Sequence, residues 1–320
     1  MRSIYNIMKI IRYTLNHKSK WDTFVNASKN GTFLHLRNYM DYHSNRFDDF
    51  SLLCVDSNEN IIALLPANKV GNNLYSHQGL TYGGWITSTK GITATSMIEL
   101  WNIMWDFLSE YGINRLIYKA IPHIYHRYPS EEDQYAIFRN GGKIQSTLIS
   151  TTIPLYESRL QFNENARRSI KHATSKGVTV SESTDFGAFW LILSQMLKER
   201  HNTSPVHTLD EIVLLHSRFP ENIKLYVATQ NDEIIGGTVM FFTHTVAHAQ
   251  YIAASLKGRE LKVLPLVFDH IINHDCDNIR YFDFGTSNED GGMYLNEGLI
   301  TQKCGMGGRG IVYNTFEIRK

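Results

Sequence analysis

Residues 50–70 read FSLLCVDSNENIIALLPANKV, and residues 224–243 read KLYVATQNDEIIGGTVMFFT. Each stretch is an apolar run, then a short turn with Asn and acidic residues, then a second apolar run that contains Ile-Ile. Two such runs around a turn of this composition predict a β-hairpin. The chain therefore contains the same hairpin twice, at a spacing of about 170 residues.

The same order of elements follows each hairpin. A third strand comes first, at 73–84 and again at 245–255. Then come an amphipathic helix, a strand, a short helix that ends in Gly-Gly, and a last strand. These four elements fall at 96–114, 115–122, 131–142 and 143–155 in the first copy, and at 264–278, 279–287, 295–308 and 310–320 in the second. So long a repeat predicts two tandem domains, residues 1–157 and 158–320, rather than a solenoid.

Local signals support the helices. Leu100, Met104 and Leu108 form one apolar stripe in the first copy, and Pro265 marks a helix start in the second. Between the copies, the segment that contains ARRSIKHATSK predicts a helix ended by Gly177. At the N-terminus, KIIRYT is expected to form the first strand.

The composition is that of an ordinary globular protein. Of the 320 residues, 42% are hydrophobic and 20% are charged, and the net charge is +1. This excludes the global basic field of dedicated nucleic-acid binders, so a polyanion must be bound by a local patch. No apolar run reaches the roughly 20 residues of a membrane span, and no signal sequence is evident, so we expect a cytoplasmic protein.

Metal and disulfide chemistry are not indicated. The three cysteines, Cys54, Cys276 and Cys304, lie far apart and form no CxxC pair. The pairs His270/His274 and His244/His248 lack further ligands at metal-site spacing, so we expect structural or surface histidines and no metal.

The element order resembles the GNAT fold, and its tandem arrangement resembles the Fem family of peptidoglycan-bridge aminoacyltransferases and their acetyltransferase-like relatives. Three motifs carry the resemblance: ARRSIKHATSKGVTV at 166–180, GLITQKCGMGG at 298–308 and SHQGLTYGG at 76–84. The resemblance implies an α/β (α+β) protein of two GNAT-like domains, each a mixed, mostly antiparallel sheet flanked by helices. It also implies an acyl-transfer site in the second domain.

The implied function is N-acyl transfer to an amine of a cell-envelope or polysaccharide precursor. The acyl donor would be an acyl-CoA such as acetyl-CoA, or an aminoacyl-tRNA, and the acceptor a small molecule or a glycan or peptide precursor. Two departures from the family pattern bear on this. Lys262 and Leu264 stand where a pyrophosphate-binding loop would place glycines, and Thr301 stands where many acetyltransferases have a tyrosine. A catalytically inactive double-GNAT binding scaffold is therefore the alternative.

Acyl transfer to an amine requires a proton acceptor and stabilisation of the developing negative charge. The resemblance places the functional lysine at Lys303. Asp283 ends a strand in which Tyr281, Asp283 and Gly285 share one face, and it is a candidate to orient or deprotonate the amine. Tyr294 is a candidate phenol near it, and each candidate also has a structural interpretation: helix-dipole cation, turn residue and core packing, respectively.

Six further residues are candidates for substrate binding. Arg167, Arg168 and Lys171 belong to the densest basic cluster, which is suited to phosphates, although a charge run is usually a solvated helix face. His77 and Tyr82 lie in the motif that resembles the substrate-facing strand and turn of the first domain. Glu297 lies at a helix start close to the candidate site.

Overall fold

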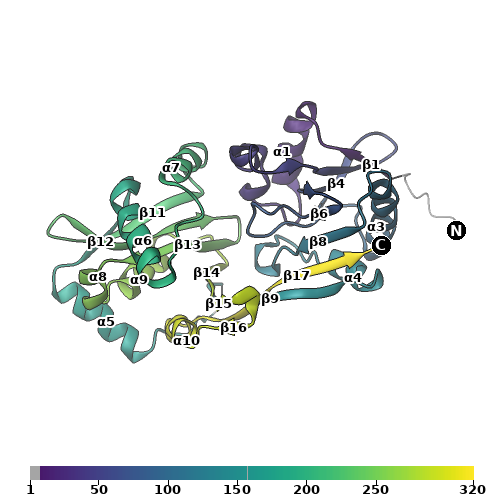
Figure 1. Ribbon diagram of the computed structural model, residues 1–320. Coiled ribbons are helices and arrows are strands. Elements are labelled where there is room, and N and C mark those ends of the chain that lie inside the picture. The colour runs from purple at the N-terminus through teal and green to yellow at the C-terminus, as the bar shows by residue number, and fades with distance from the viewer. Residues whose placement is uncertain (1–7, 157) are drawn as a thin grey trace. The chain divides into compact units, whose positions relative to one another are not determined.

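The computed structural model describes residues 8–156 and 158–320, and Figure 1 labels its elements. It forms two compact units: the described residues up to Leu148 together with Val312–Lys320, and Ile149–Ile311. The first unit contains β1 (Lys9–Arg12), α1 (Lys18–Ala27), α2 (Arg37–Met40), β2 (Asp48–Asp49), β3 (Leu52–Val55), β4 (Ile61–Leu65), β5 (Asn68–Val70), β6 (Asn73–Tyr75), β7 (Ile86–Thr87), α3 (Ala94–Ser109), β8 (Arg115–Lys119) and α4 (Glu132–Arg139).

The second unit contains α5 (Glu164–Ser175), β10 (Thr179–Ser183), α6 (Phe186–His201), α7 (Leu209–Arg218), β11 (Ile223–Gln230), β12 (Glu233–Phe242), β13 (Val246–Ala254), α8 (Leu256–Glu260), α9 (Leu264–His274), β14 (Tyr281–Thr286), β15 (Asn288–Glu289), β16 (Tyr294–Leu295) and α10 (Glu297–Gly305). Two long strands, β9 (Lys143–Pro154) and β17 (Arg309–Arg319), each begin in one unit and end in the other.

The sheet of the second unit has the order β10-β11-β12-β13-β14-β9. All neighbours are antiparallel except β13 and β14, which are parallel. Asn231 and Asp232 connect β11 to β12 with positive φ at both positions, as a two-residue hairpin turn requires. Later, Val239 pairs with Tyr251 and Met240 with Ala249, so Gln250 is a bulge in β13. The mixed, mostly antiparallel sheet is as predicted.

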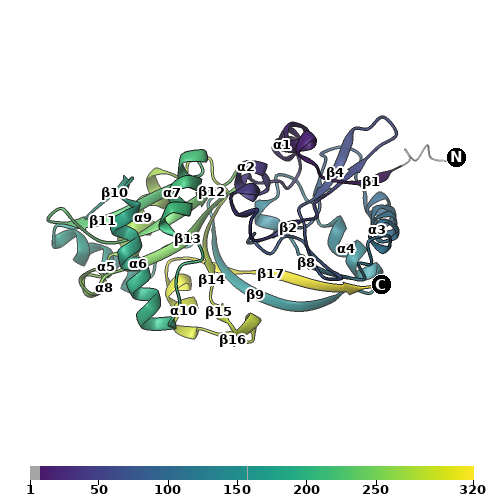
Figure 2. The same cartoon turned by 45° about the horizontal axis from the view of Figure 1, so that its top comes forward.

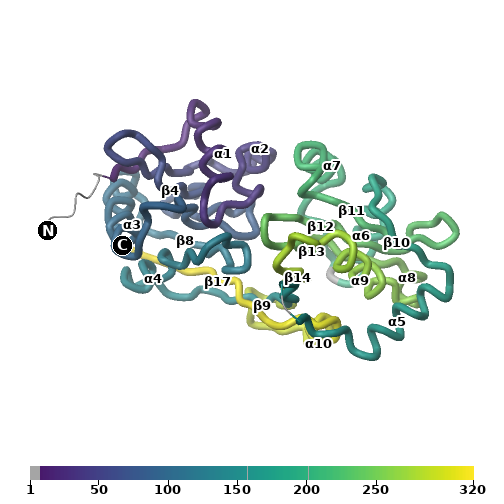
Figure 3. The backbone as a smooth tube through the Cα atoms, turned by 180° about the vertical axis from the view of Figure 1, so that it is seen from behind, coloured from purple at the N-terminus to yellow at the C-terminus, as the bar shows by residue number. Residues whose placement is uncertain are grey.

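Helices cover this sheet on both faces (Figure 1). The central strands bury side chains on both faces accordingly, and every residue of β12 from 235 to 242 is buried. Phe282 and Phe284 of β14 pack edge-on against Phe268 of α9, whereas Trp190 of α6 packs against Tyr251 of β13. The predicted alternation in β14 is thereby confirmed, and Asp283 faces away from the phenylalanines. Figure 3 shows α5, α8 and α9 from behind. Helix α5 ends before Gly177, which has φ +76°, as predicted.

The first unit contains two sheets, β1-β3-β4-β7 and a second one in which β17-β8-β6-β5-β2 are neighbours. The strand at Lys9–Arg12 and the first hairpin form as predicted. Leu100, Met104 and Leu108 of α3 are fully buried in the core. The strand predicted at 73–84 is wrong beyond Tyr75, because the chain leaves the sheet there and crosses to β7 as a loop.

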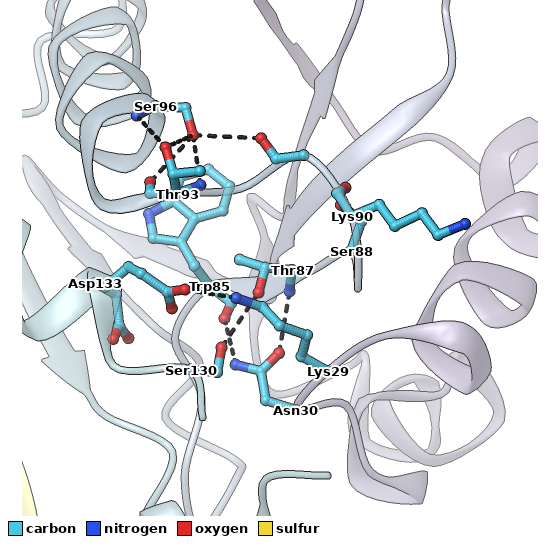
Figure 4. Close-up of polar contacts among 12 residues, drawn as sticks. Lys29, Asn30, Trp85, Thr87, Ser88, Lys90, Thr93, Ser96, Ser130 and Asp133 are labelled. Atoms are coloured by element: carbon cyan, nitrogen blue, oxygen red, sulfur yellow. Dashed lines mark hydrogen bonds and ion pairs between the residues drawn. The ribbon is translucent and has the colours of Figure 1, made fainter. Parts of the chain in front are cut away.

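A buried polar network joins three segments of the first unit (Figure 4). The side chain of Asn30 donates to the carbonyl of Trp85 and accepts from the amide of Thr87, and Thr87 contacts Ser130 at 3.3 Å. Nearby, the Tyr118 hydroxyl donates to Asp133 and accepts from the amide of Trp85. Burial raises the pKa of Asp133 to about 6. These bonds fix the loop that follows β6.

The C-terminal strand β17 pairs with the first unit, although it follows the second copy of the repeat in sequence. Sequence order placed residues 310–320 in a second domain of residues 158–320, but Thr315–Arg319 of β17 pair with β8 in the first unit. Phe316 and Ile318 are part of the core of that unit. In the first unit β9 and β17 lie side by side (Figure 2). The boundaries of the compact units therefore differ from the division at residue 157.

Candidate functional site

The parallel strands β13 and β14 separate at the centre of the second unit's sheet. They are paired from Val246 to His248 and from Tyr281 to Asp283. Among the described residues no further register pair joins them, although β13 continues to Ala254 and β14 to Thr286. Gly285, with φ +77°, redirects β14 just after the last pair. A ligand can therefore bind along the unpaired edge of β13.

A groove of about 570 Å³ lies beside this unpaired edge. Ile252–Ala254 of β13 line it, together with the start of α5, the α8–α9 connection and α10. Its charged lining residues are Arg200, Arg259 and Lys262. A second cavity of about 520 Å³ shares Lys262 with the groove and adds Arg168 and His172. The lining residues of both cavities include no Asp or Glu, so the groove is suited to an anionic ligand.

Two of these arginines have partners that a ligand can replace. Arg168 lies 3.2 Å from Glu164, and Arg259 lies 3.8 Å from Glu199, with all four side chains partly or largely exposed. Exposed ion pairs of this kind contribute only about 0–1 kcal/mol. A phosphate group can therefore compete for both guanidinium groups.

The start of α9 differs from a glycine-rich phosphate loop. Lys262 has φ +55°, and Val263, Leu264 and Pro265 follow it, so side chains crowd the helix start and Pro265 supplies no N–H. A glycine, Gly258, does lie nearby on α8. A Cβ at this position would lie 2.0 Å from the carbonyl oxygen of Ile235. That glycine therefore permits packing of α8 on β12. The basic side chains are therefore the groups of this groove that can contact an anion.

Asp283 is fully buried where β13 and β14 separate. Its Oδ1 accepts hydrogen bonds from the hydroxyls of Ser150 and Thr152 on β9, and from the amide of Gly285. Its Oδ2 lies 2.8 Å from Nδ1 of His248. A buried carboxylate with this many donors is held in one orientation. Asp283 thus lies at the centre of a polar network, and a role in orienting or deprotonating the amine stays a prediction.

His248 was not among the candidate site residues and was expected to be a structural or surface histidine. It lies on β13 directly opposite Asp283, and its side chain is 13% exposed. Spacing along the chain gives no signal for this pair, because 35 residues separate the two positions. The parallel register brings them together.

Lys303 is on α10 and only 4% exposed. Its Nζ donates to the carbonyl oxygens of Gly285 and Thr286 at 2.7 and 2.8 Å, just beyond Asp283. Burial lowers the pKa of Lys303 to about 8, and the nearby Asp283 opposes this shift. The lysine therefore carries a positive charge at neutral pH and holds the end of β14. Thr301 lines the groove on the same helix.

The other candidates from the second unit lie apart from this cluster. Tyr294 is 56% exposed on β16, and Glu297 is exposed at the first position of α10, where it favours the helix dipole. Arg167 and Lys171 are exposed on α5, and neither lines a groove described above. Of the three basic candidates, only Arg168 reaches a cavity.

His77 and Tyr82 belong to the first unit, and both are buried. His77 has φ +65° and stacks on His43 at 5.3 Å, and burial lowers its pKa to about 3. Tyr82 donates to Thr32 and packs against Tyr125. Their surroundings indicate packing roles within the loop after β6, and a role in substrate binding stays a prediction.

The first unit has a corresponding parallel pair, but with different chemistry. Strands β6 and β8 pair from Asn73–Tyr75 to Arg115–Ile117, so Tyr75 and Ile117 occupy the last register position, as His248 and Asp283 do in the second unit. Beyond it, the loop of residues 76–85 occupies the edge of β8. Its hydrogen bonds to β8 include Ser76 N to Ile117 O, Gly83 N to Lys119 O, Lys119 Nζ to Leu80 O and Trp85 N to the Tyr118 hydroxyl.

Two units, each with a parallel strand pair that separates, form a tandem GNAT-like fold. Residues 161–291 match the family model described as an acetyltransferase (GNAT) domain. Within the described residues no group of three or more potential metal ligands is found. None of the described helices combines the length and apolar character needed to span a membrane.

Solved structures share this fold over nearly the whole chain. FemX has a TM-score of 0.68 at 11% identity, with 98% of this chain and 97% of that chain covered. L-PGS from Bacillus licheniformis has a TM-score of 0.61 at 13% identity, with coverage of 94% and 91%. A tandem GNAT protein from the clavulanic acid biosynthesis pathway has a TM-score of 0.53 at 10% identity, with 98% of both chains covered. No curated protein matches the sequence.

Proposed function

We propose that this protein is an N-acyltransferase that takes its acyl group from a phosphate-bearing donor bound in the groove of the second unit. One observation carries the proposal: a groove lined by Arg200, Arg259 and Lys262, with no acidic lining residue, runs beside the unpaired edge of β13. The acyl carbonyl would lie where β13 and β14 separate, next to Asp283 and Lys303.

An aminoacyl-tRNA suits the groove better than an ordinary acetyl-CoA. Backbone amides at a glycine-rich helix start are what usually hold a pyrophosphate closely, and Val263, Leu264 and Pro265 occupy that place. Basic side chains spread over two adjoining cavities suit the spaced phosphates of a single strand. The resemblance to the Fem family and the shared fold with FemX support the same donor.

The acceptor is an amine of a cell-envelope or polysaccharide precursor. This part of the proposal rests on the resemblance to the Fem family. An inactive binding scaffold is the alternative, and it predicts ligand binding without acyl transfer.

Donor binding tests the groove directly. We expect a labelled aminoacyl-tRNA pool to bind more tightly than acetyl-CoA. The double variant Arg259→Ala/Lys262→Ala should bind it at least about tenfold more weakly, with a smaller salt dependence, because two phosphate contacts are lost. The matched control is Arg167→Ala/Lys171→Ala on α5, which removes the same charge outside both cavities and should change binding less than about twofold.

Transfer is then measured with a panel of amines, from amino sugars to peptidoglycan precursor peptides. Formation of an amide product supports the enzyme, and donor binding without product supports the scaffold. Tight binding of acetyl-CoA in preference to aminoacyl-tRNA would overturn the donor assignment. Equal loss of binding in the two double variants would remove the groove from the proposal.

A further inference from the structure

We propose that His248 is the general base that accepts the proton of the attacking amine, and that Asp283 is its positioning residue. This inference rests on the proposed N-acyl transfer at the same site. The hydrogen bond between His248 Nδ1 and Asp283 Oδ2, 2.8 Å long, carries it, together with the place of the pair where the strands separate.

The network fixes the tautomer of the imidazole. Oδ1 of Asp283 already accepts from Ser150, Thr152 and the amide of Gly285, all neutral donors, so the carboxyl group acts as an acceptor. Nδ1 of His248 must then carry the proton it donates to Oδ2. In the neutral ring the lone pair is therefore on Nε2, the atom that can accept a proton. Nε2 makes no hydrogen bond to any residue that the structure describes.

The position of the ring suits a substrate better than a core. His248 is half-buried, whereas its neighbours Ala247 and Ala249 are buried against the α9 side of the sheet. A Cβ at position 285 would lie 3.5 Å from Cε1 of His248, so glycine leaves room beside the ring. Gly285 also directs its carbonyl to Lys303. The base, the cation and the unpaired strand edge thus meet within a few residues.

The charged surroundings of the ring are simple. Asp283 faces it from β14, and Ser150 and Thr152 reach the same carboxylate from β9. The register partner of His248 on β12 is Phe241. On α10, Lys303 binds the carbonyl groups of Gly285 and Thr286. Asp283 supplies a carboxylate and Lys303 an ammonium to the contacts given for this cluster in the described residues.

The proposed step balances without a further reactant. The neutral amine attacks the acyl carbonyl carbon, and its lone pair forms the C–N bond. Nε2 of His248 takes one proton from the nitrogen of the tetrahedral intermediate. The bond from the carbonyl carbon to the ester oxygen or thioester sulfur of the donor then breaks. That leaving atom takes its electron pair and receives the proton from the imidazolium, which regenerates neutral His248.

The first unit shows that the fold does not need this pair. At the corresponding register position it has Tyr75 and Ile117, which form no comparable hydrogen-bonded pair of side chains among the described residues. A buried carboxylate with a histidine is costly to place in a sheet unless its hydrogen bonds are satisfied. Its presence in the unit that also has the groove favours a chemical role over a structural one.

The test compares turnover with donor binding in His248→Gln, using aminoacyl-tRNA or acetyl-CoA, whichever donor the wild type uses. We expect kcat for an amine acceptor to fall by about 10²–10⁴-fold and donor affinity to stay within twofold. The rise of kcat with pH that reports the base should disappear. His244→Gln, in the turn before β13, is the matched control and should keep wild-type turnover.

Two further measurements separate a base from a structural residue. Hydroxylamine is a neutral, strong nucleophile at pH 7, so its acylation should be affected at least tenfold less by His248→Gln than acylation of the ordinary amine. Asp283→Asn should shift the pH profile and lower kcat, because an amide can favour the wrong tautomer. If Asp283→Asn does not fold, His248→Gln still decides the question.

The outcomes distinguish the two proposals. A wild-type protein that binds no donor and forms no amide ends the proposed function, and this inference with it. If the wild type transfers acyl groups and His248→Gln keeps more than half of its turnover and its pH profile, the assignment of His248 as general base is wrong. The proposed function then stands. Equal losses with hydroxylamine and with the ordinary amine also contradict a proton-accepting role.

Discussion

At the scale of single residues, Lys303 differs most from its sequence interpretation. A lysine near a helix C-terminus is usually solvated, yet Lys303 is buried and its Nζ is bonded to two carbonyl groups of β14. Its ammonium is therefore a fixed charge next to Asp283 and His248. It can stabilise the developing oxyanion only through its remaining N–H, or by holding β14 in place.

This burial predicts a specific pH dependence of stability. The pKa of Lys303 is about 8 in the folded protein, against a reference value of 10.5. Burial disfavours the charged form of Lys303, so the folded protein is most stable relative to the unfolded chain above pH 10.5, where the lysine is neutral in both states. This gain in the free energy of unfolding is lost as pH falls through about 8, where the buried lysine becomes protonated. From pH 7.5 to 10, the free energy of unfolding of the wild type should therefore rise relative to Lys303→Met by up to about 3 kcal/mol.

Urea denaturation of both proteins across this pH range measures the difference. Lys257→Met is the control, because it removes a partly exposed lysine, paired with Glu233, from the same unit. A flat difference between the wild type and Lys303→Met would mean that Lys303 keeps its ordinary pKa in the folded state.

The residues found from sequence and the one missed differ for a physical reason. Lys303 and Asp283 lie in motifs whose local pattern, a Gly-rich helix end and an alternating strand, can be recognised along the chain. His248 is brought to Asp283 only by the parallel register of β13 and β14, which no local pattern encodes. The strand expected at 73–84 ends at Tyr75, so His77 lies in a loop, where sequence cannot tell exposure from burial.

At the scale of elements, the edge that is unpaired in one unit is occupied in the other. In the second unit the edge of β13 beyond His248 borders a groove. In the first unit the loop of residues 76–85 bonds to β8 along the corresponding edge. Gly83 permits this close contact, because a Cβ there would lie 1.9 Å from the carbonyl oxygen of Ser76.

This difference predicts one donor molecule bound per chain, although the fold is present twice. Isothermal titration with the preferred donor should give a stoichiometry near one, and the Arg259→Ala/Lys262→Ala variant should lose that single event. A second binding event that survives in the variant would show that the first unit also accepts a donor. Direct titration at two salt concentrations separates specific binding from nonspecific attraction of an anion.

Elements were predictable where the signal was local. The two hairpins, the stripe of α3 and the start of α9 at Pro265 follow from turn chemistry and periodicity over a few residues. The apolar run at 61–70 was predicted as one strand, but Pro66 divides it into β4 and β5, which belong to different sheets. Such a choice depends on which strands pair, and pairing is a tertiary property.

At the scale of the whole molecule, the last residues of the chain belong to the first unit, although they follow the second unit in sequence. The first unit contains Val312–Lys320, and Phe316 and Ile318 complete its core. Arg115 of β8 and Glu317 of β17 form an ion pair at 2.7 Å. Sequence order alone assigned this strand to the second domain, because a repeat shows the order of elements and leaves their partners undefined.

Removal of Val312–Lys320 should therefore destabilise the first unit and leave donor binding by the second unit largely intact. Hydrogen exchange should accelerate most at Arg115–Lys119 of β8, whose paired residues are deleted. A chain that lacks only Lys320 is the control and should exchange like the wild type. Loss of protection in β11–β13 with β8 unchanged would contradict the assignment.

The exchanged strand has a consequence for synthesis on the ribosome. Residues 149–311 contain every element of the second unit, whereas the first unit lacks an internal strand until the chain has been translated to Arg319. Domains usually fold in the order in which they emerge. Here the earlier half must wait with one edge of β8 unpaired, so nascent chains that have not yet released β17 should be the form most dependent on chaperones.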